Sequence, residues 1–176
     1  LRGRTIALVP QSVAYLDPLM RVGAQVDGDI KPKPVDRRSR LFERFGLPQH
    51  TGKLYPFQLS GGMARRVLVS TALITEAELI IADEPTPGMS LEQALEALRM
   101  FRELADEGRA VILITHDIDL AFEFADRVAV FYAGTTVETA PAVDFKTGPE
   151  ALRHPYSKAL WRALPQNGFE PVPGFQ

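Results

Sequence analysis

The chain has 176 residues, of which 45% are hydrophobic, so it can bury a core as one domain or as a domain with an added lobe. The formal net charge of −2 argues against a sequence-independent grip on nucleic acid. The absence of cysteine excludes disulfides and thiolate metal sites.

The first predicted element is a short buried strand at residues 4–9, which Pro10 and Gln11 end. A chain that starts inside a sheet is expected to be a fragment of a longer protein. Proline and glycine then interrupt the sequence repeatedly, and short helices are predicted at residues 19–26 and 35–45. We therefore expect a small, mainly helical lobe over residues 13–75.

Ser60 is a favourable helix N-cap, and the apolar residues after it predict a helix that runs to about residue 74. Residues 79–82 and 111–114 are continuously apolar, which is typical of parallel strands in a sheet covered on both faces. Between them, apolar residues recur at helical spacing up to a terminating Gly108. The pattern predicts a right-handed strand–helix–strand unit.

The last part of the chain alternates short elements. A helix is predicted at residues 118–124, followed by strands at 128–132 and 136–139 with Ala133 and Gly134 in the turn between them. Short helices are predicted at 149–153 and 156–164, and a Pro- and Gly-rich tail is predicted at 165–176.

Polar residues follow each of the three predicted parallel strands. Gln11 follows the first, Asp83 and Glu84 follow the second, and His116 follows the third. Ligands of open parallel α/β sheets bind outside the carboxyl ends of the strands, so these side chains are candidate site residues. The plain alternatives are an ordinary loop amide, a solvent-exposed acidic turn and a structural histidine.

Ser60, Gly61 and Gly62, called here the Ser60 motif, make a candidate anion site. Glycines let a phosphate approach the backbone, and the free N–H groups and dipole of a helix N-terminus favour negative charge. The alternative is that Ser60 is simply a helix cap.

In this order, the stretch from Leu59 to Met63, the strand that ends at Asp83 and Glu84, and His116 resemble three motifs of the nucleotide-binding subunit of ABC transporters. These are its signature motif, its Walker B strand and its switch histidine. The resemblance implies an α/β fold, with an incomplete P-loop NTPase (RecA-like) core over residues 1–12 and 76–148. It also implies a helical signature lobe at 13–75 and a C-terminal extension at 149–176.

The resemblance further implies an ATPase that uses ATP and Mg²⁺. Glu84 would be the general base, Asp83 the Mg²⁺ ligand through water, and His116 the contact to the γ-phosphate. Gln11 resembles the Q-loop glutamine, which senses both the attacking water and Mg²⁺.

In this family the signature motif closes over the ATP of an opposing subunit. The Ser60 motif therefore implies a head-to-tail dimer with a second ATP-binding subunit.

Two departures from the family pattern stand out. The sequence contains no G-x-x-x-x-G-K-[ST] motif, which cradles the phosphates in such proteins. We expect that loop to precede the first strand in the complete protein, and we expect this chain alone to bind ATP poorly.

In the sequence Pro87-Gly88-Met89-Ser90, the serine stands where the family usually has the aspartate of the D-loop. Ser90 could instead cap the helix that starts at Leu91.

Two stretches resemble the ATPases of oligopeptide, dipeptide and nickel importers: residues 1–7, and residues 154–160 followed by Pro173 and Gly174. This implies permease subunits as partners, indirect work with a substrate-binding protein, no nucleic acid, and a peripheral position at the cytoplasmic face of the inner membrane. The transported solute stays open. Alternatives are a non-transport ABC-type ATPase, which predicts heptad insertions or basic arms that are not visible, and a non-catalytic docking module.

Overall fold

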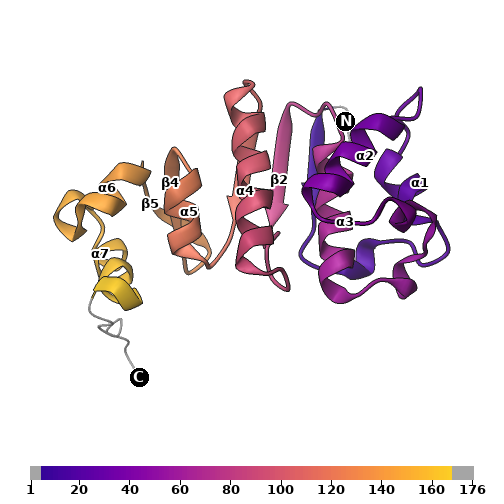
Figure 1. Cartoon of the computed structure of the whole chain (residues 1–176). Helices are drawn as coiled ribbons and strands as arrows, with labels where there is room; N and C mark the ends of the chain where they lie inside the picture. The colour runs from indigo at the N-terminus through magenta and orange to yellow at the C-terminus, as the bar shows by residue number, and fades with distance from the viewer. Residues whose placement is uncertain (1–4, 168–176) are drawn as a thin grey trace. The chain divides into compact units, whose positions relative to one another are not determined.

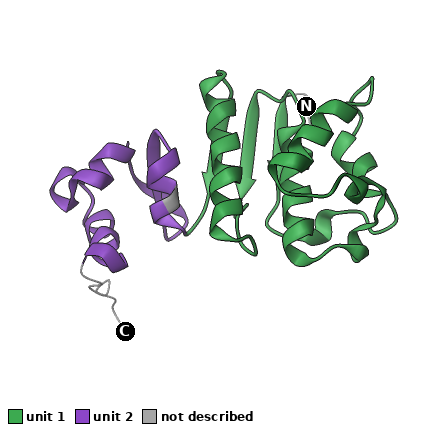
Figure 2. Cartoon of the chain, in the orientation of Figure 1, with its two compact units in different colours: residues 1–116 green, residues 117–176 purple. Residues whose placement is uncertain are grey.

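The structure is a computed structural model that describes residues 5–167, so the expectations for residues 1–4 and for the tail from residue 168, including Pro173 and Gly174, lie outside the described residues. The chain forms two compact units, Leu1–His116 and Asp117–Gln176 (Figure 2). Each unit is described by itself below. None of the described helices combines the length and apolar character that crossing a bilayer would need.

The first unit is built on a parallel sheet of three strands in the order β1-β2-β3 (Figure 1). The strands are β1 (Ile6–Val9), β2 (Leu79–Asp83) and β3 (Ala110–Ile114). Helix α4 (Leu91–Asp106) joins β2 to β3, which confirms the predicted strand–helix–strand unit. The strands lie within two residues of the predicted bounds because their apolar runs are bounded by polar residues and glycine or proline.

Only one face of this sheet is well buried among the described residues of the unit. Val9, Ile80 and Ala82 are fully buried, whereas Leu8, Ile112 and Ile114 on the alternate positions are 39%, 49% and 50% exposed. The expectation of a sheet covered on both faces is therefore wrong for this unit. Right-handed connections that step in one direction across a sheet place their helices on the same face, which leaves the other face open.

The helical lobe lies between β1 and β2 in the chain. Its elements are η1 (Val13–Tyr15), α1 (Val22–Asp27), α2 (Val35–Arg44), η2 (Gln49–Lys53), η3 (Pro56–Gln58) and the first turns of α3 (Gly61–Leu73). Helix α1 begins three residues later than predicted because the preceding turn is held by Gln25, which accepts from Asp17 N at 2.8 Å. Arg38 on α2 pairs with the buried Asp27 on α1 and ties the two helices together.

The second unit contains an antiparallel hairpin and short helices. Its elements are α5 (Ile118–Phe124), β4 (Arg127–Tyr132), β5 (Thr135–Pro141), α6 (Ala142–Thr147), η4 (Pro149–Ala151), α7 (Pro155–Arg162) and η5 (Pro165–Asn167). The predicted turn is confirmed, since Ala133 and Gly134 both have positive φ angles, 48° and 81°, as a two-residue type I′ hairpin requires. Helix α6 was not predicted, because six residues carry too little periodicity.

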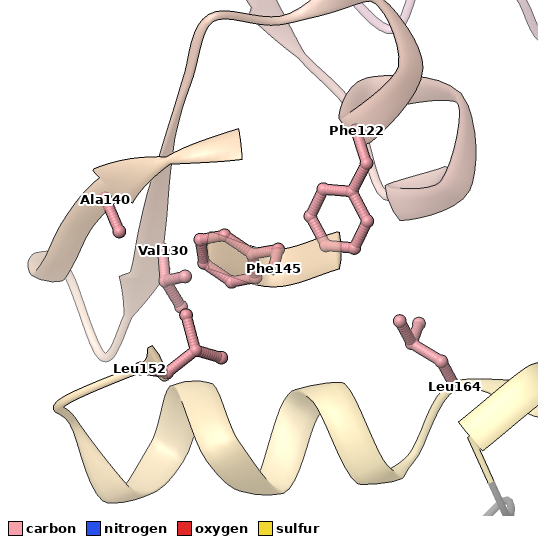
Figure 3. Packing of buried hydrophobic residues seen from close by; sticks show 6 residues of the cluster. All are labelled: Phe122, Val130, Ala140, Phe145, Leu152 and Leu164. Atoms are coloured by element: carbon pink, nitrogen blue, oxygen red, sulfur yellow. The ribbon is translucent and has the colours of Figure 1, made fainter. Parts of the chain in front are cut away.

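A small apolar core holds the second unit together (Figure 3). It consists of Phe122, Val130, Ala140, Phe145, Leu152 and Leu164. The ring of Phe145 lies 4.9 Å from that of Phe122, and the carbonyl of Phe145 accepts a hydrogen bond from Trp161 Nε1 at 2.7 Å. The core therefore joins α5, the hairpin, α6 and the C-terminal elements into one body.

Replacing Phe145 by alanine is expected to destabilise the second unit by about 3–5 kcal/mol, because a fully buried aromatic side chain leaves a cavity. Trp161 is the single tryptophan of the chain and contacts this core, so its fluorescence during urea unfolding reports on this unit. Phe131→Ala is the matched control, since Phe131 is 68% exposed on β4. Equal losses for the two variants would contradict the core assignment.

Candidate functional site

The register of the sheet brings three predicted site residues to one edge. Val9 on β1 is paired with Ala82 on β2, and Ala82 is paired with Leu113 on β3. Gln11 and Glu84 each follow this row by two positions, and His116 follows it by three. Because parallel strands end at the same edge, all three emerge at the carboxyl side of the sheet, as the sequence predicted.

Glu84 and His116 are in direct contact. Oε1 of Glu84 lies 2.7 Å from Nδ1 of His116 and accepts the backbone N–H of His116 at 3.0 Å. The backbone of Glu84 has a φ of 46°, which is uncommon for a residue other than glycine, and its N–H donates to Ile114 O at 2.9 Å. The carboxylate is thus anchored to β3 through both its side chain and its backbone.

This contact orients the imidazole. A carboxylate oxygen at Nδ1 selects a form of His116 with a proton on that nitrogen. The side chain of His116 is 84% exposed, whereas that of Glu84 is only 14% exposed. The pair can therefore present Nε2 of the histidine to a ligand outside the sheet edge while the carboxylate stays sheltered.

The second carboxylate oxygen of Glu84 differs from the first. Oε2 is buried and lacks a hydrogen-bond partner among the described residues. An unsatisfied buried acceptor costs about 1–3 kcal/mol, so such an atom in a site points to a missing donor. A water molecule would satisfy it, and a carboxylate that accepts from a water can act on it as a general base.

Asp83 ends β2 and is half-buried, next to Glu84. The described residues contain no cluster of three or more His, Cys, Asp or Glu side chains that could hold a metal ion. A single carboxylate such as that of Asp83 is compatible with a Mg²⁺ site that takes one or two carboxylates from the protein and its other ligands from water and phosphate.

The Ser60 motif begins α3, as predicted. Ser60 is the N-cap, and its hydroxyl accepts the N–H of Met63 at 3.3 Å. A side chain added at Gly61 would meet nothing within 4 Å, whereas one at Gly62 would come within 3.0 Å of Gly88 O. The first turn of α3 is thus open on the Gly61 side, where an anion could approach, and packed against the loop after β2 on the Gly62 side.

Ser90 caps α4 in the way the sequence predicted. Its hydroxyl accepts from Gln93 N at 3.4 Å, and Gln93 Oε1 accepts from Ser90 N at 3.3 Å, which is a reciprocal capping box. Gly88 in the same loop has a φ of 82°, a conformation that glycine adopts without strain. The serine therefore has a structural role at this position.

Two buried arginines on α3 were not predicted as site residues. Arg65 donates to Pro10 O at 3.2 Å and to Gln11 O, and Arg66 donates to Phe45 O at 2.6 Å. Burial lowers the pKa of both guanidinium groups, and for Arg65 the charge of Glu84 opposes that shift. The sequence signal that could have predicted their burial is the position of two adjacent arginines among the apolar residues of one helix.

The two remaining histidines have other surroundings. His50 is exposed on η2, as expected for a surface residue. His154 was also expected at the surface, but it is half-buried and caps α7, where its Nδ1 accepts the N–H of Tyr156 at 3.1 Å. The helix N-terminus needs an acceptor at this position, and the imidazole supplies it.

Comparison with known proteins shows which family the chain is similar to. The sequence profile of the ABC transporter family matches residues 1–87, which contain β1, the Ser60 motif and the Asp83–Glu84 strand end. The dipeptide transport ATP-binding protein of Haemophilus influenzae is 36% identical over 94% of this chain and 53% of its own length. The oligopeptide transport ATP-binding protein of Lactococcus lactis is 36% identical over 94% of this chain and 51% of its own length.

The chain belongs to the ABC transporter family of ATP-binding proteins. It spans about half the length of the curated relatives it matches. The family resemblance of the sequence and the α/β fold with a parallel sheet are both confirmed. A dimeric ATP-binding cassette solved with ADP and Pi has the same fold, with a TM-score of 0.70 at 23% identity over 80% of this chain and 64% of that one.

Gly62 packs closely against the backbone of Gly88, whereas Gly61 faces open space. Alanine substitutions at these two glycines should therefore differ in their effect on stability. Replacing a helical glycine by alanine stabilises a helix by about 1 kcal/mol where space allows. Gly61→Ala is therefore expected to be more stable than Gly62→Ala by about that amount, measured by urea unfolding followed by far-ultraviolet circular dichroism. A Gly62→Ala variant as stable as Gly61→Ala would contradict the packing of α3 against the loop.

Proposed function

We propose that the complete protein is the ATP-binding subunit of an ABC importer that couples ATP hydrolysis to uptake of peptides, nickel or a related small solute. The relatives named as dipeptide and oligopeptide transport ATP-binding proteins support the transport role. The observation that carries the ATPase role is the contact of Glu84 with His116 at the carboxyl edge of the sheet, with one carboxylate oxygen free to accept from water.

Glu84 is the general base in this proposal. Its free Oε2 accepts a proton of the attacking water, while Oε1 stays engaged with His116. The fixed position of the carboxylate limits the geometries in which the water can approach, which is the main way in which proteins assist phosphoryl transfer. The exposed imidazole of His116 contacts the γ-phosphate.

Asp83 and Gln11 are the residues that would bind Mg²⁺ in this proposal. Asp83 would hold Mg²⁺ through water, and Gln11, which is exposed after β1, would contact the same ion and the attacking water. When bound, Mg²⁺ neutralises charge on the phosphate oxygens during transfer.

Ser60, Gly61 and Gly62 bind the γ-phosphate held by a second ATP-binding subunit in a head-to-tail dimer. The open space beside Gly61 at the N-terminus of a 13-residue helix supports this role. The phosphate-cradling loop belongs to a part of the complete protein outside this chain, since the sequence lacks the motif and the chain spans 53% of its dipeptide-transport relative. The chain alone therefore hydrolyses little ATP.

The lobe over residues 13–75 docks on transmembrane permease subunits, which in turn receive the solute from a substrate-binding protein. The resemblance would assign residues 1–12 and 76–148 to the core and residues 149–176 to an extension, whereas the compact units of the structure divide after His116. This arrangement sets the subunit at the cytoplasmic face of the inner membrane as a peripheral protein. The short helices of the lobe, tied by the Asp27–Arg38 pair, support a compact docking body.

In the complete protein, Glu84→Gln is expected to lower kcat for ATP hydrolysis by about 10²–10⁴-fold, because an amide cannot take the proton from water. The KM for MgATP should change little, since the loss falls on the chemical step. Glu92→Gln is the control, because Glu92 is an exposed glutamate on α4. A Glu84→Gln variant with unchanged kcat would refute the general-base role.

A further inference from the structure

Arg65 reaches from the second turn of α3 to the loop that follows β1. Its guanidinium donates through Nη1 to Pro10 O at 3.2 Å and through Nη2 to Gln11 O. The residue is only 8% exposed, although its partners lie more than fifty positions earlier in the chain. One planar group thus holds two successive carbonyls of the loop that carries Gln11.

We propose that Arg65 is a positioning residue that sets the backbone of the Gln11 loop and so links that loop to the helix begun by the Ser60 motif. This inference rests on the proposed function, in which Gln11 reaches the attacking water. A change in the position of α3 would be transmitted through Arg65 to Gln11, because both carbonyls are held by the same guanidinium.

A purely stabilising role does not account for this residue. Nε of Arg65 is buried without a hydrogen-bond partner among the described residues, and burial lowers the pKa of the group. Burying a charge with an unsatisfied donor is costly, and an apolar side chain of similar length would fill the space at less cost. What an apolar side chain could not do is hold the carbonyls of Pro10 and Gln11.

The neighbouring charge supports the same role. The negative charge of Glu84 opposes the lowering of the Arg65 pKa by burial. The guanidinium is thus held to the Gln11 loop by hydrogen bonds and favoured in its charged form by the carboxylate of Glu84. Arg66, the next residue, turns the other way and donates to Phe45 O and Gly62 O inside the lobe.

The loop after β1 continues into the short helix η1. Ser12 follows Gln11 and caps η1, with its hydroxyl accepting from Ala14 N at 3.2 Å and its carbonyl accepting from Tyr15 N at 3.3 Å. Release of the Pro10 and Gln11 carbonyls would free this turn first. The amide protons of Ala14 and Tyr15 are thus local reporters of the Arg65 contact.

The first test is hydrogen exchange on this chain, which needs no enzymatic activity. Arg65→Met should raise the exchange rates of the Ala14 and Tyr15 amides by about tenfold or more, while the β2 amides change little. Arg65→Lys should give a smaller rise, because an ammonium group can bind one of the two carbonyls but lacks the paired, planar donors of a guanidinium that bind both. Arg109→Met is the control, since Arg109 donates to Thr75 O at 2.8 Å elsewhere in the unit.

The second test is ATP hydrolysis by the complete protein. Arg65→Met is expected to lower kcat by about 10–100-fold with a much smaller change in KM, because a misplaced glutamine affects the chemical step. Arg65→Lys should recover part of the loss, and Arg109→Met should retain the wild-type kcat.

Unchanged exchange at Ala14 and Tyr15, or an even rise over the whole unit in Arg65→Met, would overturn the positioning role. A local rise in exchange with wild-type kcat would overturn the link to catalysis. If Arg65→Met does not fold, the same readings on Arg65→Lys decide the question. If the unsubstituted complete protein hydrolyses no ATP, the proposed function fails, while the exchange result still judges the Arg65 contact.

Discussion

The parallel register of β1, β2 and β3 is the constraint on which the candidate site depends. Pairing of Val9 with Ala82, and of Ala82 with Leu113, forces three separate loops to leave the sheet at one edge. A slip of one residue would turn the alternate side chains to the opposite face and move the buried Ile80 and Ala82 out of the core. The apolar core thus holds the register, and the register brings Glu84 to His116.

Glu84 and His116 differ in exposure and in the contacts that remain open to them. Glu84 is sheltered, anchored through one oxygen and open through the other, whereas His116 is exposed and oriented by the same contact. The Ser60 motif and Arg65 belong to one helix, so the candidate anion site and the contact with the Gln11 loop share α3. Under the proposed function, this chain supplies the water-activating groups and the cap for a partner's nucleotide, and the phosphate cradle comes from outside it.

Much of this could be predicted from sequence because the deciding signals are local. Apolar runs that end in polar residues marked β2 and β3, and Ser60 and Ser90 marked helix starts. Contacts between residues that are far apart in the sequence were harder to predict. The Glu84–His116 contact and the hold of Arg65 on Gln11 join residues 32 and 54 positions apart, and no local pattern encodes either. The open sheet face was missed because a continuous apolar run looks the same whether one face or both are covered.

The most direct measurement is calorimetric titration of MgATP into this chain and, in parallel, into the complete protein. We expect saturable binding by the complete protein and none by this chain at the same nucleotide concentrations, because the sequence of this chain has no phosphate-cradling loop. Binding of equal affinity by both would contradict the conclusion that the chain carries only part of a shared nucleotide site.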